Sequence, residues 1–167
     1  LAVTLPRAGN LGGGGFMLVY LKERDEIFYI DYRSKSPLNS SIENIFDLAK
    51  SRNLKPQDFT NNMFDKTRYG YKAPAVPGTV AGLLEAHEKF GKLPLQEILE
   101  PVIKQAEEGI IVSYDLSKAI EDTKQLKFDS ESLKIYFNNG EAIKENSIFK
   151  RPDLAKTMTL ISKNGFK

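Results

Sequence analysis

Four consecutive glycines, Gly12 to Gly15, lead directly into an apolar stretch from Phe16 to Leu21. A second, nearly apolar stretch runs from Ile27 to Tyr32, and the charged residues from Lys22 to Glu26 separate the two. Such a pattern predicts a β-hairpin that is covered on both faces, as in a sheet between layers of helices. Because glycine has no β-carbon, another backbone or a ligand can approach the segment before the hairpin closely. Periodicity alone leaves other architectures open.

Helices are predicted for most of the chain after the hairpin. Ser40 and Glu43 form a capping-box pattern, which predicts a helix from about Ser41 to Arg52. The stretch from Asn53 to Ala75, with its prolines and asparagines, is expected to be a loop. Helical spacing of apolar residues predicts further helices at Thr79–Phe90, at Pro94–Ala106 with a kink at Pro101, from about Ser113, and from Pro152. Asn138-Asn139-Gly140 predicts a turn. Since no repeat or linker interrupts the pattern, we expect one domain.

Charge and composition exclude several function classes. The 24 basic and 22 acidic residues are spread along the chain, so nothing favours a nucleic-acid surface. No apolar run approaches the roughly 20 residues that cross a bilayer. The absence of cysteine removes disulfides, zinc–thiolate sites and cysteine nucleophiles, but leaves the compartment open. His87 is the single histidine, without cysteine or clustered carboxylates, and is therefore expected to be structural and not a metal ligand.

Arg33 is the candidate binding residue, because a guanidinium at a strand end suits a bidentate grip on a carboxylate. From residue type alone, a solvent-facing arginine is the more frequent outcome. Asp31 could pair with Arg33 or with the backbone, and Arg7 adds a second cation before the glycines. The glycine run matches neither a phosphate loop nor a dinucleotide fingerprint, so its predicted role is steric. The carboxylates of Glu107, Glu108 and Asp153 are expected to be solvated.

Five blocks in one order resemble the large subunit of gamma-glutamyltranspeptidases. They are Gly12-Gly13-Gly14-Gly15-Phe16-Met17, Asp31-Tyr32-Arg33, Val76-Pro77-Gly78-Thr79-Val80-Ala81-Gly82, Leu93-Pro94-Leu95 and Pro152-Asp153-Leu154-Ala155-Lys156-Thr157. The resemblance implies an α+β fold, the layered αββα sandwich of N-terminal nucleophile hydrolases. In this chain the sandwich would be incomplete, a hairpin followed by several helices. Residues 1–167 would be a single piece of the large subunit, with both ends missing.

The resemblance also implies an activity: transfer or hydrolysis of the gamma-glutamyl group of glutathione and similar compounds. In that family a precursor cuts itself, and the new N-terminal threonine of the small subunit is the nucleophile. This chain would then hold no catalytic residue and would be inactive alone, with the small subunit as its partner. Arg33 would hold the α-carboxylate of the substrate, and no metal or organic cofactor is implied.

Two departures from the family pattern bear on the substrate. Ser34 and Ser36-Pro37 follow Arg33, where the family usually has glutamate and an Ala-Pro pair, and Arg7-Ala8-Gly9-Asn10 replaces a serine-rich approach to the glycines. Loss of the acid beside Arg33 removes a possible orienting partner for its guanidinium. Two alternatives therefore stay open: a related acylase or amidohydrolase with another acyl group, and a non-catalytic homologue that acts as a scaffold subunit.

Overall fold

A computed structural model describes residues 1–41 and 73–165 of the chain. It contains helices and strands, in agreement with the predicted α+β class. Backbone contacts divide the chain into two compact units, one of residues 11–80 and one of residues 1–10 with 81–167. Apart from Ser41, the helix predicted from Ser41 to Arg52 lies outside the described residues, as does most of the loop predicted from Asn53 to Ala75. That the whole chain is one piece of a large subunit remains a prediction.

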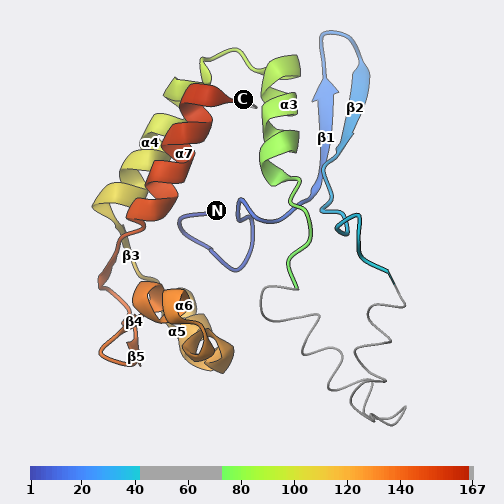
Figure 1. Cartoon of the computed structure of the whole chain (residues 1–167). Coiled ribbons are helices and arrows are strands. Elements are labelled where there is room, and N and C mark those ends of the chain that lie inside the picture. The colour runs from blue at the N-terminus through green and yellow to red at the C-terminus, as the bar shows by residue number, and fades with distance from the viewer. Residues whose placement is uncertain (42–72, 166–167) are drawn as a thin grey trace. The chain divides into compact units, whose positions relative to one another are not determined.

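The first unit is built on an antiparallel hairpin, β1 (Phe16–Leu21) and β2 (Glu26–Asp31), as Figure 1 shows in blue. Phe16 lies opposite Asp31, and Leu21 opposite Glu26. At the turn, the Tyr20 hydroxyl donates to Asp25 Oδ1 at 3.0 Å, and Asp25 adopts a left-handed φ of 50°. The hairpin is confirmed, although β2 begins and ends one residue earlier than predicted.

Only one face of the hairpin is covered within the described chain. On that face Ile30 is buried, and its neighbours Met17 and Val19 are partly buried. The opposite face is apolar yet exposed, with exposed fractions of 57 to 72% for its five large side chains, which are Phe16, Leu18, Tyr20, Ile27 and Tyr29. The prediction of cover on both faces is therefore not met by these residues, because the described segments place side chains against one face only.

The helices of the second half follow the predicted pattern closely. Helix α3 (Thr79–Phe90) has the predicted bounds, and α4 (Leu95–Glu108) continues past Pro101. Helix α7 (Pro152–Asn164) begins with its proline in the first turn, where the missing N–H costs nothing, and ends before Gly165 at a φ of 58°. Helices α4 and α7 pack along one another (Figure 1), and each contains a fully buried alanine, Ala106 and Ala155 respectively.

A small core holds the rest of this unit together around helix α5 (Tyr114–Asp122). Its buried side chains are Val112, Leu116, Ile120, Phe137 and Phe149. Around it lie elements that the sequence pattern does not predict, because they are too short to show periodicity. They are the 3-10 helix η2 (Lys124–Phe128), α6 (Ser130–Tyr136), and the strand pairs β3 (Ile110–Ile111) with β6 (Ile148–Phe149) and β4 (Phe137–Asn138) with β5 (Glu141–Ala142). The turn predicted at Asn138-Asn139-Gly140 joins β4 to β5. Asn138 is the last residue of β4, and Asn139 and Gly140 both have positive φ.

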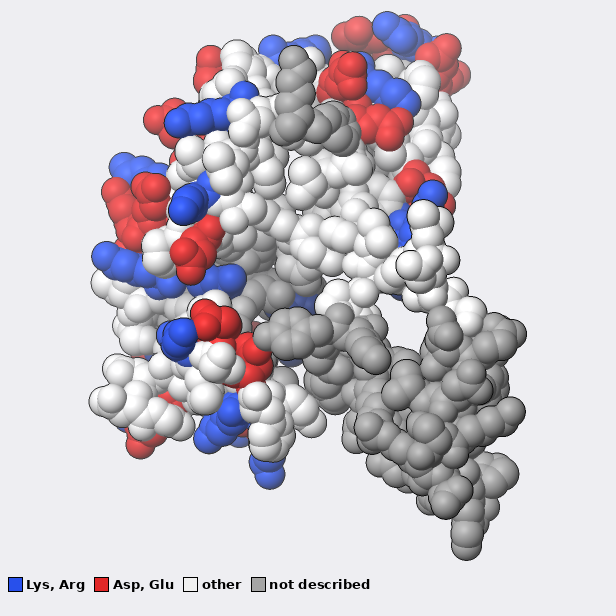
Figure 2. Space-filling view, in the orientation of Figure 1, with Lys and Arg blue, Asp and Glu red and all other residues white. Residues whose placement is uncertain are grey.

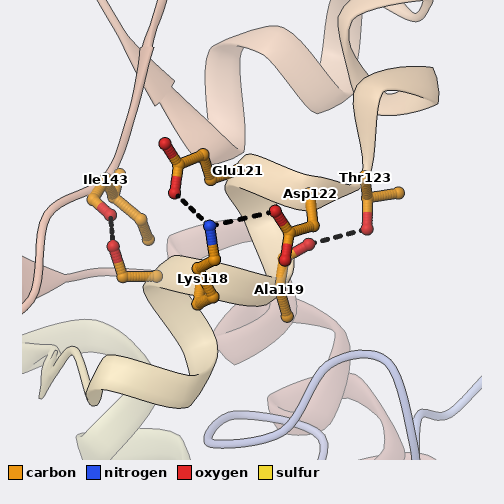
Figure 3. Close-up of polar contacts among 7 residues, drawn as sticks. Lys118, Ala119, Glu121, Asp122, Thr123 and Ile143 are labelled. Atoms are coloured by element: carbon orange, nitrogen blue, oxygen red, sulfur yellow. Dashed lines mark hydrogen bonds and ion pairs between the residues drawn. The ribbon is translucent and has the colours of Figure 1, made fainter.

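Polar contacts fix both ends of α5. Ser113 caps its N-terminus by accepting the N–H of Leu116 at 3.2 Å. Near the C-terminus, the Lys118 ammonium contacts Glu121 and Asp122, each at 3.1 Å, and Thr123 Oγ1 donates to the Ala119 carbonyl (Figure 3). The hydrogen bonds to these two carboxylates, Glu121 first, raise the pKa of Lys118. Lys118, Glu121 and Asp122 are solvent-exposed, so their ion pairs shape the helix end more than they add stability.

Basic and acidic side chains intermingle over the surface seen in Figure 2, in keeping with the even spread of charge along the sequence. Among the described residues, no helix combines the length and the apolar character needed to cross a membrane.

Candidate functional site

Arg33 follows the end of β2 by two residues, and its side chain is exposed. Within residues 1–41 and 73–165, its guanidinium takes part in no ion pair or hydrogen bond. A guanidinium without a protein partner keeps its donors available for a ligand carboxylate. The side chain is therefore suited to bind an anion, and what fixes it is its backbone.

The carboxylate of Asp31 holds that backbone. Asp31 Oδ1 accepts the backbone N–H of Arg33 at 2.9 Å, a turn that aspartate and asparagine form readily. Of the two partners considered for Asp31, the structure selects the backbone.

The glycine segment packs against the same backbone. Gly15 and Tyr32 exchange both backbone hydrogen bonds, at 3.1 and 3.2 Å, and so continue the pairing of β1 with β2. A β-carbon on Gly14 would overlap Ser34 N and stand 2.7 Å from the Tyr32 carbonyl oxygen. A β-carbon on Gly15 would stand 2.9 Å from the Tyr32 ring. These approaches agree with a steric role for the glycines.

A third segment, residues 76–79, forms backbone hydrogen bonds with both the glycine segment and the segment after Arg33. Lys35 and Val76 form an antiparallel bridge with backbone hydrogen bonds of 2.8 and 3.0 Å. The N–H groups of Gly78 and Thr79 both donate to the Gly13 carbonyl, at 2.9 and 3.0 Å, which supplies an acceptor at the first turn of α3. Arg33 is thus held between the Gly15–Tyr32 pair and the Lys35–Val76 bridge. The blocks are visible in the sequence, but the contacts between them are not.

His87 lies elsewhere, on α3. Its Nε2 is 2.7 Å from the Leu93 carbonyl oxygen, and its ring packs on Gly91, where a β-carbon would stand 2.5 Å from the imidazole Cδ2. This contact closes the connection between α3 and α4, in agreement with a structural role. No group of metal-binding side chains gathers in the part of the chain that the structure describes.

The remaining charged candidates are exposed. Arg7 belongs to the segment of residues 1–10 and is exposed. Glu107 and Asp153 are exposed, as predicted, and Glu108 makes only a loose pair with Lys104 at 3.8 Å. All four belong to the unit that does not contain Arg33.

Comparison with known proteins gives a consistent result. The family model described as gamma-glutamyltranspeptidase matches residues 1–167. The glutathione hydrolase proenzyme of Pseudomonas aeruginosa is 37% identical over 165 residues, which cover 99% of this chain and 27% of that protein. The chain therefore spans about a quarter of the length of this relative.

Solved structures agree with the sequence comparison. The gamma-glutamyltranspeptidase of Helicobacter pylori superposes with a TM-score of 0.86 at 34% identity, over 99% of this chain and 45% of that one. The transpeptidase CapD of Bacillus anthracis superposes with a TM-score of 0.74 at 32% identity, over 100% of this chain and 48% of that one. With the family model matching every residue, the chain belongs to the gamma-glutamyltranspeptidase family.

Proposed function

We propose that this chain is the substrate-binding part of an enzyme that transfers or hydrolyses gamma-glutamyl groups, and that Arg33 holds the α-carboxylate of the substrate. One observation carries the proposal: the Arg33 guanidinium is exposed and has no partner among the described residues, while the backbone around it is held by hydrogen bonds. These are the bond to Asp31 Oδ1, the Gly15–Tyr32 pair and the Lys35–Val76 bridge. A fixed cation can orient an amide for attack, because the entropy of positioning is lost before the reaction starts.

The chemistry would be acyl transfer by a threonine that lies outside this chain. That threonine, with its own α-amine as the base, attacks the gamma-glutamyl amide carbon, and the amine leaves with the proton. Water or the amine of an acceptor then takes the acyl group and releases the threonine. The name of the Pseudomonas aeruginosa relative, a proenzyme, supports a precursor that is processed into subunits.

The exposed apolar face of the hairpin is a surface on which another layer of the complete assembly would pack. The family's αββα sandwich would place more protein over this face, which carries Leu18 and Ile27 at exposed fractions near 70%. The processed small subunit is the partner that we propose for the complete assembly. By itself, the chain should have no turnover. Hydrolysis of a gamma-glutamyl anilide by the purified 167-residue chain would contradict this expectation.

The acyl group itself is proposed from the family. CapD is similar over the whole chain, and its name associates it with capsule biosynthesis, so membership alone does not fix the substrate. Ser34 stands where the family usually has glutamate, and leaves the guanidinium of Arg33 without a neighbouring acid at that position.

Substitution of Arg33 in the complete, processed protein tests the proposal. Arg33→Lys replaces a bidentate fork with a point charge and should weaken binding of gamma-glutamyl substrates. Arg33→Ala should weaken binding further, by about 2 to 4 kcal/mol for loss of a charge-assisted pair. Self-cleavage should survive both changes. Unchanged kinetics in Arg33→Ala, together with lost activity in Arg7→Ala, would assign the carboxylate contact to Arg7.

A further inference from the structure

The direction of the Arg33 side chain depends first on the backbone from which it leaves. Arginine has a long, flexible side chain, and only a fixed α-carbon gives its guanidinium a preferred region to occupy. At Arg33 the strand has ended, so no ladder hydrogen bond to β1 holds the backbone N–H. That N–H donates instead to Asp31 Oδ1 at 2.9 Å.

Asp31 therefore contacts the backbone N–H of Arg33 and not its side chain. The Asp31 carboxylate makes no ion pair with the Arg33 guanidinium in the described structure, although the two residues are close in sequence. A side-chain oxygen that accepts an N–H two residues ahead fixes the intervening peptide in a turn. The intervening residue, Tyr32, is at the same time bound through both backbone groups to Gly15.

We propose that Asp31 is a positioning residue, which sets the direction of Arg33 by accepting its backbone N–H. This inference rests on the proposed function of Arg33. It makes a specific claim about chemistry: the oxygen at the end of a side chain of this length matters, and the negative charge does not. Asparagine offers the same oxygen without charge, whereas glutamate keeps the charge but moves the oxygen by one methylene group.

The test compares Asp31→Asn with Asp31→Glu in the complete, processed protein. Steady-state kinetics with a gamma-glutamyl anilide give KM and kcat, and thermal unfolding checks the fold. We expect Asp31→Asn to keep KM within about twofold, and Asp31→Glu to raise KM about five- to tenfold, the equivalent of one lost hydrogen bond of ordinary strength. The value of kcat should change less than KM, because a binding contact is affected. Asp31→Ala should resemble Asp31→Glu.

Asp25→Asn is the matched control. Asp25 lies on the same hairpin, accepts a hydrogen bond from Tyr20, and has the same charge to lose. Asp25→Asn removes a negative charge from the hairpin but leaves the turn between Asp31 and Arg33 in place, so it should leave KM unchanged.

Each outcome decides the question. A raised KM in Asp31→Asn would overturn the proposal, because this variant keeps the acceptor oxygen and loses only the negative charge. Normal KM in Asp31→Glu and Asp31→Ala, with a raised KM in Arg33→Ala, would overturn the role of Asp31 alone. A normal KM in Arg33→Ala would contradict the proposed function, and the role of Asp31 would fall with it.

Discussion

The α-carbon of Gly78 lies against the carbonyl oxygen of Tyr32 so closely that a β-carbon at position 78 would overlap that oxygen. Because the oxygen belongs to the backbone and accepts the N–H of Gly15, it cannot move without breaking the pairing next to β1 and β2. Gly78→Ala should therefore displace residues 32–34 and cost about 1 to 3 kcal/mol of stability. Amide hydrogen exchange in the complete protein should accelerate at Gly15 and Tyr32.

A glycine in open space provides the comparison for this prediction. No atom lies within 4 Å of a β-carbon built on Gly140, and asparagine tolerates its positive φ. Gly140→Asn should leave the exchange of Gly15 and Tyr32 unchanged. If the amides of Gly15 and Tyr32 exchange as slowly in Gly78→Ala as in the parent protein, the Tyr32 backbone accommodates the added carbon and the prediction is wrong.

The open hairpin face should make the isolated 167-residue chain bind hydrophobic dyes and self-associate. Leu18 and Ile27 lie on that face with exposed fractions of 72% and 70%. Leu18→Lys should reduce dye fluorescence and association in the isolated chain, because it places a charge in the middle of the apolar surface. Sedimentation and dye titration measure the two effects.

Leu38→Lys is the control for this substitution, since Leu38 is fully exposed but lies outside the hairpin. It should change dye binding little. A compact monomer that unfolds cooperatively and has no affinity for the dye would contradict the prediction for the parent chain.

Arg151 should stabilise the small core of the second unit through two aromatic rings. Its guanidinium lies 5.6 Å from the centroid of Tyr136 and 5.7 Å from that of Phe149, and Nη1 donates to the Tyr136 hydroxyl at 3.3 Å. Arg151→Lys should cost about 1 kcal/mol, and Arg151→Ala about 2 kcal/mol, because the latter also loses the contacts of the aliphatic stem. Denaturant unfolding of the complete protein measures these changes. Lys156→Ala, an exposed change on α7, should have an effect below about 0.5 kcal/mol.

Asp129 should make the stability of α6 sensitive to acid. Its carboxylate accepts the N–H of Ser132 at 2.7 Å, and this hydrogen bond lowers the pKa of Asp129 below the ordinary value of 3.8. The fold thus favours the charged form. Its contribution to stability is complete above pH 3.8 and is lost as the pH falls through the lowered pKa. In Asp129→Asn, which keeps the acceptor but cannot titrate, this acid-dependent loss should disappear. Thermal unfolding between about pH 2 and 7 measures it, and an unchanged profile in Asp129→Asn would contradict the assignment.

Local patterns in the sequence determined the hairpin, the helices α3, α4, α5 and α7, and the turn at Asn139-Gly140. Each of these depends on residues close together in the chain: alternation or helical spacing, a capping serine, or a glycine that permits positive φ. The resemblance to the family likewise depended on short blocks that can be read in order.

Tertiary structure alone decided how three of those blocks meet, at residues 12–15, 31–35 and 76–79. Whether the Asp31 carboxylate binds a guanidinium or a backbone N–H depends on the path of the chain after β2, which Gly14 and Gly78 determine by admitting the Tyr32 backbone. The short strands β3 to β6 form because of their partners, since two residues carry no period of their own. The sequence therefore shows the residues around Arg33 only as separate motifs. Long-range backbone contacts bring these motifs together, and no local sequence pattern predicts such contacts.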